Sequence, residues 1–152
     1  MQCLNKYFKK AKKNEMEERD YLKRQIDVLG RILGKLLSDL LEKKGNGEIV
    51  GGIELTNQIL NEELNLTIEK ITEIPEEDFV NFLETEKKFT NENLEQLAEI
   101  MIVNIESGID EITKLKLYNK SLILLEHIEK NDKTYSFERH LKIEKIKGII
   151  SN

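Results

Sequence analysis

A regular ladder of apolar residues near the start of the chain restricts the possible folds most strongly. Its members follow one another at alternating intervals of four and three residues: Leu22, Ile26, Leu29, Leu33, Leu36 and Leu40. This spacing places the whole ladder on one face of an α-helix, because side chains three and four residues apart lie above one another. We therefore predict a long helix, from about residue 15 or 20 to residue 43, that buries this face against other helices.

The rest of the chain predicts further helices joined by short turns. Apolar residues recur at helical spacing over residues 53–64, in a short segment that begins at Pro75, and over residues 91–107, 109–130 and 135–150. A proline suits the first turn of a helix, and Gly45 and Gly108 suit helix ends. With one proline, no tryptophan and much Leu, Ile, Glu and Lys, the composition favours helix over sheet. The predicted fold class is all-α, built from antiparallel helical hairpins.

The distribution of charge predicts a basic extension on an acidic helical domain. Residues 1–13 contain five lysines and no acidic residue, although the whole chain has a net charge of -5. A length of 152 residues suits one domain with an ordinary hydrophobic core. We expect a basic N-terminal extension over residues 1–17 and a single helical domain over residues 18–152.

The expected environment is the cytoplasm of a bacterium. Cys3 is the only cysteine, so an internal disulfide is excluded and a reducing compartment is favoured. No apolar run approaches the ~20 residues that a membrane-spanning helix needs, and lysines interrupt the first residues where a signal peptide would be apolar. The abundance of Lys, Ile and Asn is typical of an AT-rich genome.

Two windows are similar to the second helix of a tetratricopeptide unit. The first contains Gly47, Ile49, Gly52, Thr56, Ile59 and Leu60, of which Thr56 and Ile59 depart from the pattern. The second covers residues 117–122, and Gly108 lies one residue too far upstream of it. Both windows favour a tetratricopeptide-like stack of hairpins.

The start of the ladder also resembles an uncharacterised family of small proteins, found chiefly in Gram-positive bacteria. The residues that carry the resemblance are Asp20, Tyr21, Leu22, Lys23, Arg24, Gln25 and Ile26, followed by the leucine-rich helix. The similarity extends over about residues 20–130, and residues 1–17 lie outside it. It implies a tetratricopeptide-like helical fold and brings no established activity with it.

No catalytic, metal or cofactor site is expected. His127 and His140 have carboxylates nearby in the sequence but lack the spacing of a metal-binding motif. Cys3 has no identifiable base partner. The glycines between residues 45 and 52 are better explained as a turn than as a phosphate-binding loop, which would end in Gly-Lys-Ser or Gly-Lys-Thr.

The resemblance favours a noncatalytic module that binds an unknown protein or peptide. The surface around Tyr21, Arg24 and Gln25 is the first candidate for contact. Arg24 could pair with a carboxylate of the partner, Gln25 could hydrogen-bond a peptide backbone, and Tyr21 could supply an amphipathic contact. A structural alternative is that Tyr21 lies in the core and Arg24 pairs with Asp20 or Asp27.

The basic extension supports an alternative function. Lys6, Lys9, Lys10, Lys12 and Lys13 lie opposite an apolar strip of Leu4, Tyr7, Phe8 and Ala11. This pattern fits a peripheral adaptor for an anionic membrane or a nucleic acid. Nucleic acid is not the favoured partner, and a frayed, solvated extension explains the same residues.

Two glycines inside the predicted long helix need an explanation, because glycine costs a helix interior about 1 kcal/mol relative to alanine. Gly30 and Gly34 are four residues apart and clear one strip of the helix. The strip either packs against the second helix of the same chain, which we favour, or forms a homodimer through the long helix.

Overall fold

The computed structural model describes the backbone of residues 2–152 and the side chains of residues 13–152. This range folds into seven α-helices and one short 3-10 helix, and no strand occurs in it. The helices are α1 (Gln2–Gly45), α2 (Gly52–Leu64), α3 (Ile68–Glu73), α4 (Glu76–Thr85), α5 (Asn91–Val103), η1 (Asn104–Glu106), α6 (Glu111–Asn131) and α7 (Phe137–Ser151). The all-α prediction is confirmed, and so is the long N-terminal helix.

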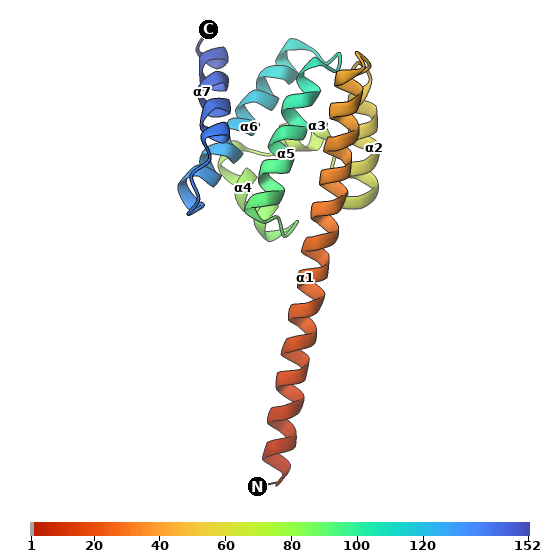
Figure 1. Cartoon of the computed structure of the whole chain (residues 1–152), viewed down its shortest axis with the longest axis vertical. Coiled ribbons are helices and arrows are strands. Elements are labelled where there is room, and N and C mark those ends of the chain that lie inside the picture. The colour runs from red at the N-terminus through yellow and green to blue at the C-terminus, as the bar shows by residue number, and fades with distance from the viewer. Residues whose placement is uncertain (1) are drawn as a thin grey trace.

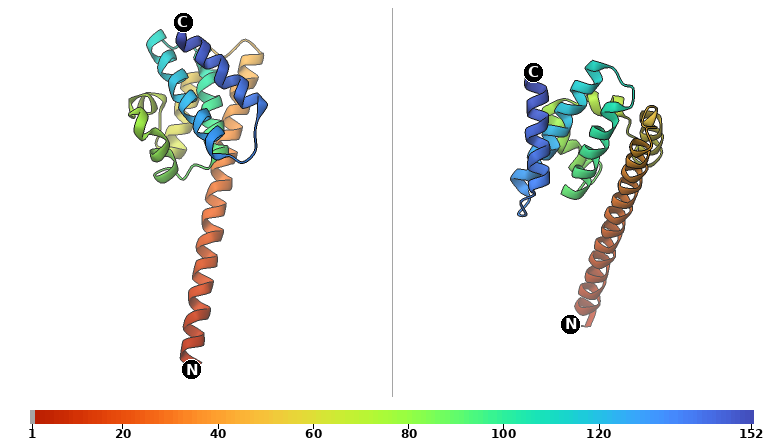
Figure 2. Two further views of the ribbon diagram at one scale, coloured as in Figure 1. Left: turned by 90° about the vertical axis from the view of Figure 1, so that its left-hand side faces the viewer. Right: turned by 45° about the horizontal axis from the view of Figure 1, so that its top comes forward.

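Four helices lie side by side in the order α1, α5, α6 and α7, and the shorter helices cover one side of them (Figures 1 and 2). The helix α5 packs against both α1 and α6, and α6 packs against α7. On the covered side, α2 packs against α1, while α3 and α4 pack against α6. In this order α5 and α6 run in opposite directions, and so do α6 and α7, as expected for short connections. The neighbours α1 and α5 run in the same direction (Figure 1). The finer prediction of a tetratricopeptide-like stack stays a prediction.

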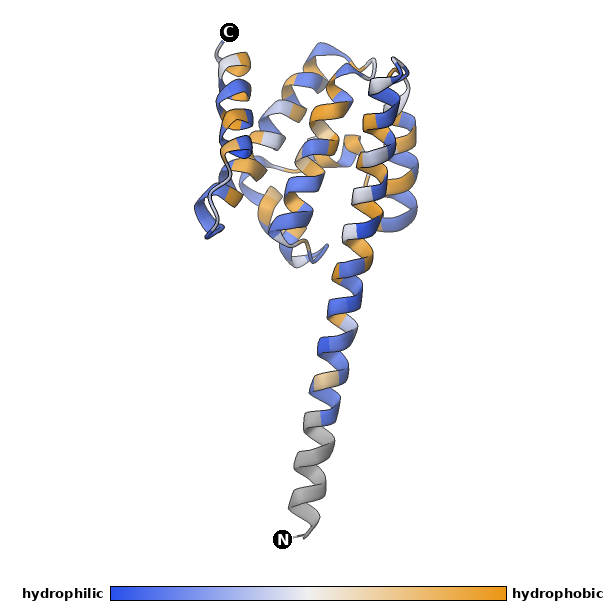
Figure 3. Cartoon of the chain, in the orientation of Figure 1, coloured by the Kyte–Doolittle hydropathy of each residue, from blue (hydrophilic) through white to orange (hydrophobic). Residues whose placement is uncertain are grey.

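The helix α1 joins the body only through its C-terminal part. Leu29, Leu33, Leu36 and Leu40 are buried, whereas Leu22 is 47% exposed and Ile26 is 38% exposed. The expectation that the whole ladder is buried is therefore wrong for its first two members. Residues 13–28 are exposed on every side and form a rod that projects from the body (Figure 1). Apolar residues become dense on α1 only where it enters the body (Figure 3).

The helix α5 is central, as its apolar residues on several faces lead one to expect. Leu94, Leu97, Ala98, Ile100 and Met101 are fully buried between the neighbouring helices. The helix begins one residue after Thr90, whose hydroxyl accepts a hydrogen bond from the Asn93 backbone N–H in a capping box. It ends at Val103 and continues as η1, rather than running on to Gly108 as predicted.

Several helices begin directly after a residue whose side chain caps the first turn. Pro75 is the N-cap of α4 and not its first residue. Asp110 and Ser136 cap α6 and α7 by accepting hydrogen bonds from backbone N–H groups in the first turn. The short helix α3, capped by Thr67, was not predicted from the sequence, because six residues are too few to display a helical period.

Candidate protein-interaction groove

A groove lies where α1 leaves the body. Its volume is about 730 Å³, which is within the usual range of ligand pockets. We call it the α1 groove. It is lined by α1, by the C-terminal end of α2 and by the loop between α4 and α5: Tyr21, Arg24, Gln25, Ile26, Val28, Leu29, Ile32, Asn61, Glu62, Glu63, Leu64, Asn65, Glu86, Lys87 and Lys88.

The three candidate contact residues of the sequence analysis all line this groove. Tyr21 is 61% exposed, so it is not a core residue. The Gln25 side-chain amide donates a hydrogen bond to the Tyr21 hydroxyl at 3.0 Å, one helical turn away. Arg24 forms no ion pair with Asp20, Asp27 or any other residue within the range 13–152. Its guanidinium is available to an external carboxylate.

The wall of the groove formed by α1 is partly apolar and partly uncovered. Val28 is 44% exposed and Ile26 is 38% exposed, while Leu29 is buried at the edge of the core. Tyr21, Gln25 and Val28 share one helical face, because they are spaced four and three residues apart. An apolar stripe left open beside a packed core offers burial to an incoming side chain.

The opposite wall is held in place by local backbone geometry. The helix α2 ends at Leu64, and its C-cap Asn65 has a left-handed conformation with φ 50°. The Lys87 ammonium donates a hydrogen bond to the Leu64 carbonyl at 2.7 Å and lies 5.8 Å from the centre of the Phe82 ring. Lys88 is also left-handed, with φ 61°. Lys87 thus ties the α4–α5 loop to the end of α2, so these two segments form one continuous wall.

The rim of the α1 groove carries charges of both signs. Glu62, Glu63 and Glu86 lie on it together with Lys87 and Lys88, in addition to the guanidinium on α1. Sequence reasoning missed this wall, because its residues are distant from the ladder in the sequence. Only the turn signals around residues 65 and 88 could have indicated it.

A smaller cleft of about 410 Å³ lies between α1, α5, α6 and α7. Leu37 and Leu41 of α1, Ile102 of α5 and Ile149 of α7 contribute its apolar lining, and lysines and glutamates surround it. The cleft contains none of the three candidate contact residues Tyr21, Arg24 and Gln25. It is a second, separate surface on the same helix.

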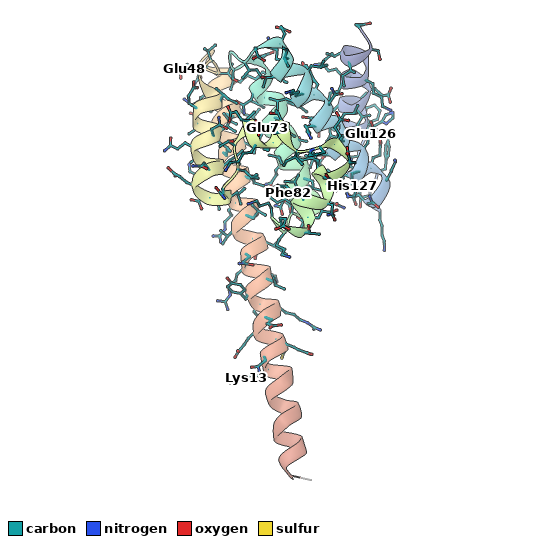
Figure 4. The ribbon with its side chains drawn as sticks, turned by 180° about the vertical axis from the view of Figure 1, so that it is seen from behind. Lys13, Glu48, Glu73, Phe82, Glu126 and His127 are labelled. Carbon is teal, nitrogen blue, oxygen red and sulfur yellow. The ribbon has the colours of Figure 1, made fainter. Side chains whose placement is uncertain are left out.

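The only two histidines of the chain lie in helix-to-helix contacts. His127 Nε2 of α6 is 3.6 Å from Glu84 Oε1 of α4, and His127 faces α4 in Figure 4. His140 Nδ1 of α7 is 3.2 Å from Glu129 Oε1 of α6. Among residues 13–152, no group of three or more His, Cys, Asp and Glu side chains is placed to hold a metal ion. Each histidine pairs with one carboxylate.

A buried cation, Lys120 of α6, also serves packing. The Lys120 ammonium donates a hydrogen bond to the Ile74 carbonyl and lies 4.6 Å from the centre of the Phe79 ring. Burial lowers the pKa of the Lys120 ammonium, and the charges of Glu76 and Glu77 partly oppose this effect. These contacts join α6 to α3 and α4 and contribute nothing to either groove.

Of the basic extension, Lys13 is the one lysine whose side chain is described. It is exposed on the projecting part of α1, far from the body (Figure 4). Lys6, Lys9, Lys10 and Lys12 lie outside the residues whose side chains are described. The membrane or nucleic-acid contact proposed for these five lysines stays a prediction. No helix within the described range combines the length and the apolar character needed to cross a membrane.

The glycine strip of α1 packs within the chain. The Gln96 side-chain amide of α5 donates a hydrogen bond to the Gly30 carbonyl at 3.0 Å. A β-carbon on Gly34 would lie 3.4 Å from the same amide nitrogen, and one on Gly30 would lie 3.7 Å from Asn93 Nδ2. The helix that approaches the strip is therefore α5, and not the second helix as we predicted. A homodimer through this glycine strip would have to displace α5.

Comparisons with protein-family models, with curated proteins and with solved structures gave no match. The resemblance to the family of small bacterial proteins therefore stays a prediction. The structure itself shows a small all-helical protein over the described residues.

Proposed function

We propose that the protein is a noncatalytic interaction module and that its α1 groove binds a peptide segment of another protein. The observation that carries the proposal is the position of the groove. The surface around Tyr21, Arg24 and Gln25, which was singled out from the sequence, lines a groove of about 730 Å³ beside exposed apolar residues.

The chemistry of the α1 groove fits a peptide better than a small charged substrate. Its apolar wall can bury side chains of a partner, and Tyr21 presents both a ring and a hydroxyl. Arg24 can pair with a carboxylate on the partner. Gln25 can exchange its hydrogen bond with the Tyr21 hydroxyl for one with a peptide backbone. Lysines and glutamates on the opposite wall can then select the charges that flank the bound segment.

The tetratricopeptide-like resemblance supports the same reading at the level of fold. Helical hairpin stacks commonly bind peptides along grooves between helices, but fold alone does not establish function. The proposal therefore depends on the groove itself. The alternative, an adaptor that uses the basic extension, predicts binding that is independent of the groove.

The proposal can be tested with two matched substitutions on α1. Val28 lines the α1 groove and is 44% exposed, whereas Leu41 lines the smaller cleft and is 50% exposed. Partners captured from the source cell by the intact protein are compared with those captured by Val28→Asp and Leu41→Asp. We expect Val28→Asp to lose a partner that Leu41→Asp retains, because a buried carboxylate without a counter-charge is costly in an interface.

Circular dichroism of both variants controls for folding. A photo-crosslinking residue at position 28 should attach to the captured partner, and the same residue at exposed Ile112 of α6 should not. Equal capture by the two aspartate variants would contradict the assignment of the groove.

A further inference from the structure

An exposed face of α1, opposite the apolar ladder, carries a row of alternating charges. Two members of the row, Asp27 and Arg31, also border a cleft of about 400 Å³ with the first turn of α5. Asp20, Arg24, Asp27 and Arg31 are spaced four, three and four residues apart, so they share one helical face. We call them the charged stripe. The stripe is offset by two positions, or about 200° around the helix, from the apolar ladder that enters the core. All four side chains are exposed.

The charges of the stripe are not neutralised by ion pairs with other residues in the range 13–152. Arg31 Nε donates only a 3.4 Å hydrogen bond to the Asp27 carbonyl oxygen. The single ion pair on the described part of α1 joins Lys35 and Asp39 at 3.4 Å. The stripe can therefore accept charges from outside.

The order of these charges is complementary to its own reversed copy. Two antiparallel α1 helices that place Asp20 opposite Arg31 also place Arg24 opposite Asp27, because both pairs are centred on the bond between residues 25 and 26. Twofold symmetry repeats both pairs, so the stripe forms opposite-charge contacts along its whole length. A parallel arrangement in register would instead set each charge against its own like charge.

We propose that the protein forms a twofold homodimer in which the charged stripe of α1 pairs with the stripe of a second, antiparallel copy. The exposed face continues over the body through Ser38 and Glu42, so the projecting part of one α1 can lie along the other molecule. Because all four side chains of the stripe are exposed, the pairing uses surface that α2 and α5 leave open.

The proposed pairing also supplies a partner for the projecting rod. A helical segment without tertiary contacts is only marginally stable in water, and residues 13–28 have exposed side chains throughout. The groove-facing side of α1, with Tyr21 and Val28, lies about a quarter turn away from the stripe. The dimer therefore does not rest on the proposed peptide-binding function. The two proposals share Arg24, which lines the groove, so its guanidinium pairs either with the second copy or with a carboxylate of the peptide.

A charge-swap experiment tests the dimer. Sedimentation of the full chain is measured from micromolar to submillimolar concentration for the wild type, Arg31→Asp, Asp20→Arg and the double variant. Each single variant replaces two attractive contacts with two repulsive ones, which should raise the dissociation constant about tenfold or more. The double variant restores opposite charges and should return the constant to within about threefold of wild type. Lys116→Asp, at an exposed position of α6, serves as the control. It makes the same change in net charge as an Arg→Asp substitution and should leave the dimer intact.

The orientation is tested with a spin label on a variant that carries Cys3→Ser and Met16→Cys. In the antiparallel dimer, position 16 lies opposite position 35 of the second copy, so the two labels should be about 28 Å apart along the axis. Labels in near contact would indicate a parallel pair and overturn the proposal. A wild-type protein that stays monomeric throughout the concentration range, or a double variant that fails to recover dimerisation, would also overturn it.

Discussion

Individual core residues divide into those that fill space and those that carry a buried charge. Leu33 is fully buried in the contact of α1 with the body. Lys120 and Arg139, by contrast, are 3% and 4% exposed although both are cationic. Arg139 Nη2 donates a hydrogen bond to the Thr134 carbonyl oxygen at 3.1 Å, and Nη1 lies 3.4 Å from Glu95 Oε2. Buried charges of this kind require such partners.

The position of Leu33 predicts a large loss of stability on truncation. Leu33→Ala should lower the free energy of unfolding by ~2 to 5 kcal/mol, because a cavity replaces well-packed atoms. Leu22→Ala, in the same ladder but 47% exposed, should change it by less than about 0.5 kcal/mol. Urea denaturation monitored by circular dichroism measures both. Similar losses for the two variants would contradict the assigned end of the α1 core contact.

The lowered pKa of Lys120 predicts a pH dependence of stability at alkaline pH. Burial disfavours its charged form, so the folded protein releases this proton at a lower pH than the unfolded chain, whose value is near 10.5. Below the folded-state pKa the cost of the buried charge is fully present. It is relieved as the pH rises through that pKa toward 10.5, so this contribution to stability increases with pH.

The measurement is the free energy of unfolding of the wild type and of Lys120→Met at a series of alkaline pH values. The wild-type value minus the variant value should increase as the pH approaches 10.5. This comparison cancels the titration that both proteins share. Parallel curves for the two proteins would show that burial does not control the protonation of Lys120.

At the scale of helices, the sequence predicted long periodic segments well and long-range neighbours poorly. The ladder indicated α1 correctly because its spacing matches the helical period and four of its members pack in the body. It could not indicate where α1 leaves the body, since Leu22 and Leu33 have equal hydrophobicity and differ only in what packs against them. For the same reason, Tyr21, Arg24 and Gln25 were named as a surface, while the opposite wall at Leu64 and Lys87 was not.

The helix contacts predict opposite effects for alanine at two glycines. A β-carbon on Gly30 would have its nearest neighbour at 3.7 Å, an ordinary contact, whereas one on Gly52 would lie 3.0 Å from Ile49 Cδ1 and 3.3 Å from Leu40 Cδ2. Gly30→Ala should stabilise the protein by ~0.5 to 1 kcal/mol through helix propensity. Gly52→Ala should destabilise it by ~1 to 3 kcal/mol through overpacking. Thermal denaturation distinguishes the two, and stabilisation by Gly52→Ala would contradict the described packing of α2 on α1.

For the molecule as a whole, the predicted division at residue 17 falls inside the continuous helix α1. Deletion of residues 1–13 removes no described core residue, so the truncated protein should fold with an unchanged unfolding midpoint. If the α1 groove binds the principal partner, the truncated protein should keep that partner, with at most slower association from lost charge steering. Binding kinetics on an immobilised partner measure both effects.

The adaptor alternative makes the contrary prediction. Binding through Lys6, Lys9, Lys10, Lys12 and Lys13 would disappear on deletion of residues 1–13 and would weaken steeply with salt. Anionic vesicles and a duplex DNA, each tested with intact and truncated protein, separate the two anionic targets. Salt-sensitive binding by the intact chain, together with loss of every protein partner on truncation, would replace the groove proposal with the adaptor.

The projecting part of α1 has a mechanical consequence. Residues 13–28 extend the helix by about 24 Å beyond the last residues that pack in the body, and a continuous helix transmits rotation along its length. A tilt of about 10° at the base of this lever would shift its far end by about 4 Å. Small changes in the packing of Leu29 and Leu33 in the body would therefore move residue 13 far enough to form or break a contact there.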